Sequence, residues 1–156
     1  MTDASLCLLF WQWIEMMPND SSAHTVQLLM IAPLLISGLS HIFQPKMWRD
    51  FFGMLHNMGT PGVVFRTYAL ELTFATIIVA FHQVWQGPGI IITIYGCLLM
   101  TKCLISALFP KVGMRSLAMS QTAGNMGFRV AGVALLGLGG LCIWLVWGET
   151  NSLPIG

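Results

Sequence analysis

Two residues of opposite charge, Glu71 and Lys102, lie within long apolar stretches of this chain. A tight turn at Gln86 and Gly87 separates the two stretches, and both charged residues lie equally many positions away from it. Because every residue of a helix adds the same rise, we expect the acid and the base to lie at the same depth on neighbouring helices. A charge at membrane depth costs several kcal/mol unless it is paired or hydrated. The pattern therefore indicates a polar site inside the membrane.

This pair could relay protons or ions, anchor the polar group of a ligand, or fix the register of two helices as a structural ion pair. Arg66 lies five positions before Glu71, which is more than one α-helical turn, so we expect it to compete for the carboxylate without stacking directly beneath it. Tyr68 adds a hydroxyl group near the same level. We therefore predict an intramembrane polar site formed by Glu71, Lys102, Arg66 and Tyr68. Nearby hydroxyl groups belong to Thr67, Thr101 and Ser106.

The histidines form two pairs, each on one side of the predicted membrane. His24 begins the first apolar stretch and His82 nearly ends the second, whereas His41 ends the first and His56 follows it. All four are candidate ligand-binding or cofactor-binding residues, because two histidines at one depth on facing helices can bind haem b. A metal site would need a third ligand at closer spacing. The eleven methionines are scattered along the chain, a pattern that does not favour copper.

The composition of the chain identifies its solvent. Its 156 residues are 56% hydrophobic and 8% charged, whereas soluble domains carry about 25% charged residues. Four apolar stretches, at residues 25–43, 63–84, 89–109 and 127–147, each approach the roughly 20 residues that a helix needs to cross a bilayer. We predict an all-α protein with a single integral membrane domain over residues 1–156, a polytopic four-helix transmembrane bundle. The net charge of +1 argues against a nucleic-acid partner.

Shorter segments are predicted to lie on the membrane surface as amphipathic helices. Residues 45–58 begin with Pro45 and repeat apolar side chains at helical spacing, and residues 111–126 show a weaker version of this pattern. Residues 6–14 carry Trp11 and Trp13 and are too short to cross a bilayer, which predicts an interfacial helix. Pro33 is expected to kink the first spanning helix near its middle.

The basic residues predict the orientation of the chain. Every Lys and Arg except Lys102 lies in or beside two connections, at residues 44–62 and 110–126. The positive-inside rule places both connections in the cytoplasm and both termini outside. This pattern suits a bacterial inner membrane. The first residues carry Asp3 and no base, so we expect no cleavable signal peptide.

The motifs favour a protein without catalytic activity. The sequence contains no G-x-S-x-G motif and no P-loop, and Glu71 is the only carboxylate within a predicted span. The favoured function is an accessory or stabilising subunit of a larger membrane complex. The small residues of the fourth span would contact other subunits or a second copy of the chain. The alternatives are a small proton-linked carrier that uses Glu71 and Lys102, and a haem- or quinone-associated redox protein.

Overall fold

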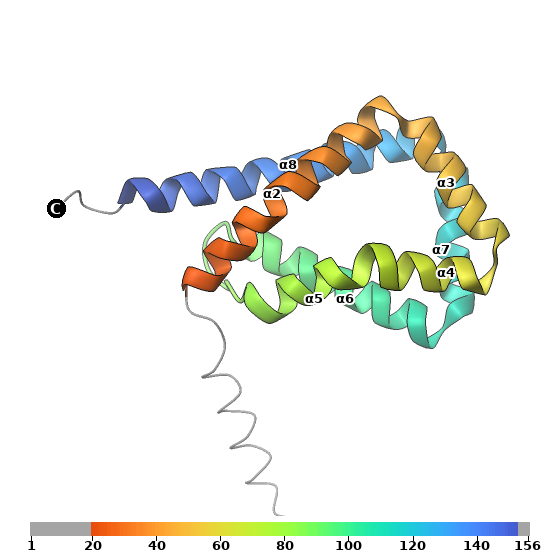
Figure 1. The fold of residues 1–156 in the computed structure, drawn as a ribbon, viewed down its shortest axis with the longest axis horizontal. Coiled ribbons are helices and arrows are strands. Elements are labelled where there is room, and N and C mark those ends of the chain that lie inside the picture. The colour runs from red at the N-terminus through yellow and green to blue at the C-terminus, as the bar shows by residue number, and fades with distance from the viewer. Residues whose placement is uncertain (1–19, 153–156) are drawn as a thin grey trace, which may run out of the picture.

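The computed structural model describes residues 20–152, and every regular element in that range is helical (Figure 1). The elements are α2 (Asp20–Phe43), α3 (Pro45–Asn57), α4 (Thr60–Phe65), η1 (Arg66–Glu71), α5 (Leu72–Phe81), α6 (Ile90–Leu108), α7 (Pro110–Thr122) and α8 (Gly124–Ser152). Four helical runs are long and apolar enough to cross a membrane: Ser22–Phe43, Thr60–Phe81, Ile90–Leu108 and Gly124–Gly148. The predicted all-α class with four membrane-spanning helices is therefore confirmed. The interfacial helix expected at residues 6–14 lies outside the described residues.

The second spanning helix begins and ends three residues earlier than the sequence predicts. Gly59 adopts a left-handed backbone conformation, with φ of 69°, and the helix starts directly after it with Thr60 and Pro61. At the other end, the hydroxyl of Thr93 lies 3.1 Å and 2.9 Å from the carbonyl oxygens of His82 and Val84. This side chain on α6 provides a partner for the carbonyl groups of the loop that follows α5, so the helix can end before His82. In the first spanning helix, Pro33 does not end α2, which continues as one helix from Asp20 to Phe43.

The small residues of α8 allow it to pack closely along α2. A Cβ atom added at Gly132 would lie 2.7 Å from the carbonyl oxygen of Gly38, and one added at Gly139 would lie 2.9 Å from Leu35. Gly137 and Gly140 face open space instead. Close backbone approach replaces the hydrophobic effect as the source of helix association in lipid. Part of the small-residue face of α8 therefore serves the protein's own packing.

The helices α5 and α6 form a second pair. A Cβ atom at Gly96 would lie 2.2 Å from a side-chain carbon of Ile78, so only glycine permits the observed approach. The two helix pairs meet at one end through a buried apolar cluster formed by Val26, Met30, Leu34, Ile78, Ile92 and Cys142. The first residues of α2, the last residues of α8 and the loop at residues 82–89 lie at this end (Figure 1).

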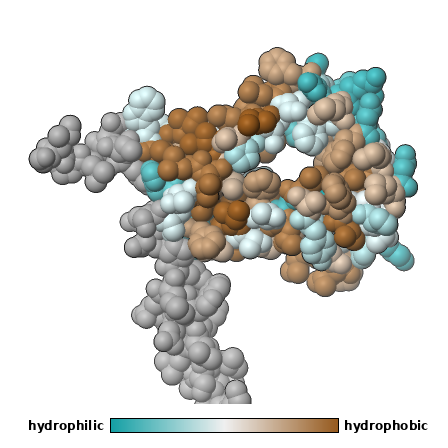
Figure 2. All heavy atoms as spheres, in the orientation of Figure 1, coloured by the Kyte–Doolittle hydropathy of each residue, from teal (hydrophilic) through white to brown (hydrophobic). Residues whose placement is uncertain are grey.

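The opposite end is closed by two short helices, α3 and α7, which form where residues 45–58 and 111–126 were predicted to be helical. Leu55, Val63 and Leu117 are buried together where α3, α4 and α7 meet. Figure 2 shows hydrophilic residues gathered at this end of the molecule. The same figure shows an opening between the α2–α8 pair and the α5–α6 pair. The two pairs are therefore splayed apart between a narrow end and a wide end.

Candidate functional site

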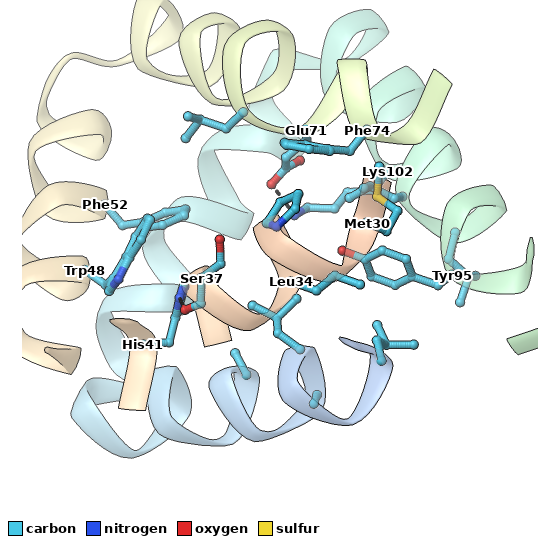
Figure 3. A pocket seen from close by; sticks show the side chains of 18 of the residues that line it. Met30, Leu34, Ser37, His41, Trp48, Phe52, Glu71, Phe74, Tyr95 and Lys102 are labelled. Carbon is cyan, nitrogen blue, oxygen red and sulfur yellow. Dashed lines mark hydrogen bonds and ion pairs between the residues drawn. The ribbon is translucent and has the colours of Figure 1, made fainter. Parts of the chain in front are cut away.

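A cavity of about 670 Å³ lies between the two helix pairs (Figure 3). This volume falls within the roughly 300–1,000 Å³ of small-molecule binding sites. Most of its wall is apolar and includes Met30, Leu34, Phe74, Leu98, Leu135 and Leu138. Its polar groups are Ser37, His41, Glu71, Tyr95 and Lys102. The cavity thus combines a large apolar volume with a few polar side chains.

Glu71 and Lys102 meet on the α5–α6 wall of this cavity. The Lys102 Nζ atom lies 2.6 Å from Glu71 Oε1, and Figure 3 draws this contact as a dashed line. The Glu71 side chain is 12% exposed, whereas that of Lys102 is 44% exposed. A lysine ammonium group has three N–H donors. Because Lys102 uses one of them in its contact with Glu71 and lines the cavity, it can donate to a further group there.

Arg66 makes the pair into a cluster of three charges. Its Nε atom lies 3.6 Å from Glu71 Oε1, the same oxygen that Lys102 contacts. Its other nitrogens donate hydrogen bonds of 3.2 Å to the hydroxyl oxygens of Ser106 and Ser116. Arg66 is only 1% exposed, and its Nε has no hydrogen-bond acceptor. One carboxylate is therefore shared between two cations.

A change of helix type explains why Arg66 reaches Glu71. Residues Arg66–Glu71 form a π-helical turn, in which the N–H of Leu72 donates to the carbonyl of Thr67 five positions earlier. This wider turn brings residues five apart onto one face, whereas an α-helix does so for residues three or four apart. Arg66 therefore reaches the carboxylate that Lys102 also contacts, through a π-helical turn that was not predicted. Such turns occur frequently at functional sites.

A second cavity of about 290 Å³ adjoins the first on the side of α7. Its lining includes Arg66, Ser116 and Ser120, and it shares His41, Phe52 and Lys102 with the larger cavity. The smaller cavity therefore contacts both cations of the cluster. Lys102 lies at the boundary between the two cavities, and the smaller one differs from the larger by having Arg66 in its otherwise mostly apolar wall.

The fourth member of the predicted polar site and one of the nearby hydroxyl groups lie away from the cluster. Tyr68 is 54% exposed and lines neither cavity. The hydroxyl of Thr101 bonds to the carbonyl of Cys97 in its own helix. Tyr95, which was not among the predicted site residues, lines the larger cavity. Its spacing of seven residues from Lys102 places both on one face of α6, and this spacing could have identified it.

His41 also lines both cavities and is held in place by its neighbours. Its Nδ1 donates to the carbonyl oxygen of Ser37 at 2.7 Å, because a carbonyl can only accept. Its ring stacks on that of Trp48 at a centroid distance of 4.1 Å. The Trp48 Nε1 donates to the hydroxyl of Ser40 at 2.9 Å, which fixes the stack. His41 is thus a rigid wall residue near the boundary between the cavities.

His82 belongs to a separate cluster at the narrow end of the molecule. It is fully buried within the protein, directly after the end of the second spanning helix. Its Nδ1 lies 2.9 Å from the hydroxyl of Thr93 and its Nε2 lies 3.2 Å from the amide nitrogen of Gln27. Since Thr93 donates its own hydrogen to a carbonyl, His82 donates through Nδ1 and accepts from Gln27. Burial lowers the pKa of His82, against the opposing effect of a backbone hydrogen bond. Haem ligation through Nε2 would require the contact with Gln27 to break.

The other two histidines lie apart from the cavities. His24 is half-buried in the first turns of α2, and His56 lies near the end of α3 with its Nδ1 buried and without a hydrogen-bond partner. Within residues 20–152, no group of three or more His, Cys, Asp or Glu side chains is placed to hold a metal ion.

Comparison with protein families, with curated proteins and with solved structures found no match to this chain. The site is therefore interpreted from its own geometry. A large apolar cavity that adjoins a smaller one with Arg66 and Lys102 in its wall can accommodate a molecule with an apolar body and a polar end. The same walls offer no activated nucleophile with an adjacent base among the described residues.

Proposed function

We propose that this integral membrane protein binds an amphiphilic small molecule between its two helix pairs. The 670 Å³ cavity, with Glu71 and Lys102 on an otherwise largely apolar wall, carries the proposal. An apolar body would fill the volume between the pairs, and a polar end would contact the charged cluster. Burying that body would contribute roughly 25 cal/mol per Å² of apolar surface.

The shape of the molecule supports access from the membrane. Figure 2 looks across the helix axes, and the opening that it shows lies between the two helix pairs. If these helices cross the bilayer, this opening faces the acyl chains of the lipid. A membrane-dissolved molecule could then enter sideways without passing through water.

The charged cluster also favours a binding role over a purely structural ion pair. A pair that only fixed helix register would be most stable with its hydrogen-bonding groups satisfied within the protein. Here Lys102 is partly exposed and lines two cavities, and only one of its N–H groups contacts Glu71. Its remaining donors are available to a ligand.

We further propose a bacterial inner-membrane location with both chain termini outside. The support is the charge distribution: the basic residues other than Lys102 lie in or near α3, α7 and the adjoining helix ends. Cysteine substitutions at Lys46 on α3 and at Gln86 in the opposite loop test this proposal. In intact cells, an impermeant maleimide should label the residue at position 86 and not the one at position 46; the reverse pattern would overturn it.

Photolabelling tests the binding proposal. The purified protein in lipid nanodiscs is irradiated with hexadecanol that carries a diazirine near the end of its chain, and labelled peptides are identified by mass spectrometry. We expect saturable labelling at Leu98, Leu135 and Leu138. Ala134→Phe should abolish it, because Ala134 lines the cavity. Val133→Phe adds the same ring to a surface of α8 that lines neither cavity and should leave it unchanged.

Labelling that is confined to lipid-facing residues, or that Ala134→Phe does not alter, would overturn the binding proposal. The competing function is an accessory subunit of a larger membrane complex, as the sequence favours. It would be supported if the chain lacked saturable labelling and co-purified with stoichiometric partner subunits from its native membrane.

A further inference from the structure

We infer that the ligand is an anionic amphiphile whose head group occupies the smaller cavity, between Arg66 and Lys102, while its chain extends into the larger one. This inference rests on the proposed function and adds the charge and the position of the head group. It is carried by the charge balance of the cluster, by the unused donors of Lys102 and by the lining residues that the two cavities share.

The charges around the two cavities do not balance. Arg66 and Lys102 provide two positive charges, whereas Glu71 provides the only carboxylate among the described residues that line either cavity. The second cation is expensive in a membrane interior unless a further anion or water accompanies it. A head group with one negative charge would bring the cluster to neutrality, whereas a cationic head group would increase the imbalance.

The donors around the smaller cavity are suited to an anion. Lys102 retains N–H groups beyond the one that contacts Glu71, and it lines the smaller cavity together with Arg66. The hydroxyl of Ser116 accepts a hydrogen bond from Arg66, so its own hydrogen remains available for donation. Hydrogen bonds between charged donors and an oxyanion are about twice as strong as neutral ones. An uncharged hydroxyl head group would gain less from the same site.

The arrangement of the cavities fixes the orientation of the ligand. Both cavities are lined by His41, Phe52 and Lys102, so the head group and the chain can occupy adjoining spaces. The smaller cavity lies toward α7, at the hydrophilic end of the molecule shown in Figure 2. The larger one extends toward the apolar cluster that includes Met30 and Leu34. A ligand bound in this way would have the same orientation as a lipid of the adjacent leaflet.

Competition against the labelled hexadecanol tests the head-group charge. Unlabelled hexadecanoic acid, hexadecyl phosphate, hexadecanol and hexadecylamine share one chain and differ in the head group. We expect the acid to compete at least about tenfold more strongly than the alcohol, which corresponds to about 1.4 kcal/mol, and the amine to compete least. Comparing hexadecyl phosphate with hexadecanoic acid shows whether the site prefers a phosphate or a carboxylate head group.

Two substitutions of Lys102 test whether the preference for anionic competitors depends on the charged cluster. Lys102→Gln should reduce the advantage of the anionic competitors over hexadecanol to less than about threefold, and Lys102→Arg should retain most of it. Lys46→Gln removes a positive charge from the exposed surface of α3, and should leave the preference unchanged. Each variant is compared after its thermal unfolding midpoint shows that it is folded.

The outcomes separate the two proposals. If the alcohol labels the cavity and all four competitors act equally, the anionic head group is wrong and the binding function stands. If neither the alcohol nor a labelled acid reaches the cavity, both proposals fall. The competition series on the unaltered protein decides the charge preference even if Lys102→Gln does not fold.

Discussion

The membrane region of this protein holds two polar clusters, and they handle the cost of burial differently. At the narrow end, Gln27, His82 and Thr93 are uncharged and buried, and they bond to one another across the two helix pairs. Only the Gln27 Oε1 atom of this cluster is without a partner. Toward the wide end, Arg66, Glu71 and Lys102 are charged and border two cavities.

The difference indicates which cluster is built for stability and which for binding. The histidine cluster uses its donors within the chain, so its contacts can hold the two helix pairs together at their narrow end. The charged cluster has more positive than negative charge, and Lys102 retains donors that can reach both cavities. Polar groups that remain unsatisfied beside a cavity are candidates for ligand contact, whereas satisfied ones are part of the scaffold.

Removing the carboxylate should have the largest effect on stability. Glu71→Gln leaves Arg66 and Lys102 without a counter-charge, and breaking a buried ion pair from one side costs about 3–5 kcal/mol. We expect the free energy of unfolding to fall by about 3 kcal/mol, the lower end of this range, because Lys102 is partly exposed and solvation offsets part of the loss. Thermal unfolding in a mild detergent measures it. The double variant with Lys102→Met should recover part of the loss, and an unchanged midpoint in Glu71→Gln would show that the carboxylate does not balance the cations.

Disrupting the histidine cluster should have a smaller effect on stability and none on binding. His82→Leu removes both ring hydrogen bonds and leaves polar atoms of Gln27 and Thr93 buried without those partners. We expect a loss of about 2 kcal/mol, within the range for an unsatisfied buried group. Photolabelling of the cavity should be preserved. If the His82→Leu variant is fully folded and still loses labelling of the cavity, the histidine cluster contributes to binding and the two clusters do not have separate roles.

The same residue predicts a pH dependence of stability. Burial lowers the pKa of His82 in the folded protein, so folding favours the neutral ring. The stabilisation is therefore complete above the unfolded pKa of about 6.5 and is lost as the pH falls below it. Unfolding midpoints measured between pH 8 and pH 5 should fall more steeply for the native protein than for His82→Gln. Equal slopes would show that His82 does not titrate with unfolding.

The smallest effect is expected at Tyr68, the one member of the predicted polar site that lies away from it. Tyr68→Phe removes a hydroxyl from an exposed side chain that lines neither cavity, so stability should change by less than about 0.5 kcal/mol. Competition by hexadecanoic acid should be unaffected. A loss of anion preference in this variant would place the head group on the outer face of the helix instead.

The fold could be predicted to the level of its elements because lipid leaves the backbone few choices. A chain with four apolar stretches of this length must close its hydrogen bonds within helices. Pro45 and the apolar repeat that follows it were enough to predict α3. The turn between the second and third spans also indicated where Glu71 and Lys102 lie, because distance along a helix converts directly into depth.

Depth along the helices was therefore set by the sequence alone, whereas lateral position and rotation were decided by the tertiary structure. The π-helical turn that brings Arg66 to Glu71, and the burial of His82 beneath Gln27, depend on contacts between helices that no local pattern encodes. The cavities depend on how far the two pairs are splayed. That distance follows from the close glycine contacts of α2 with α8 and from α3 and α7 across the wide end, which are contacts between residues far apart in the chain.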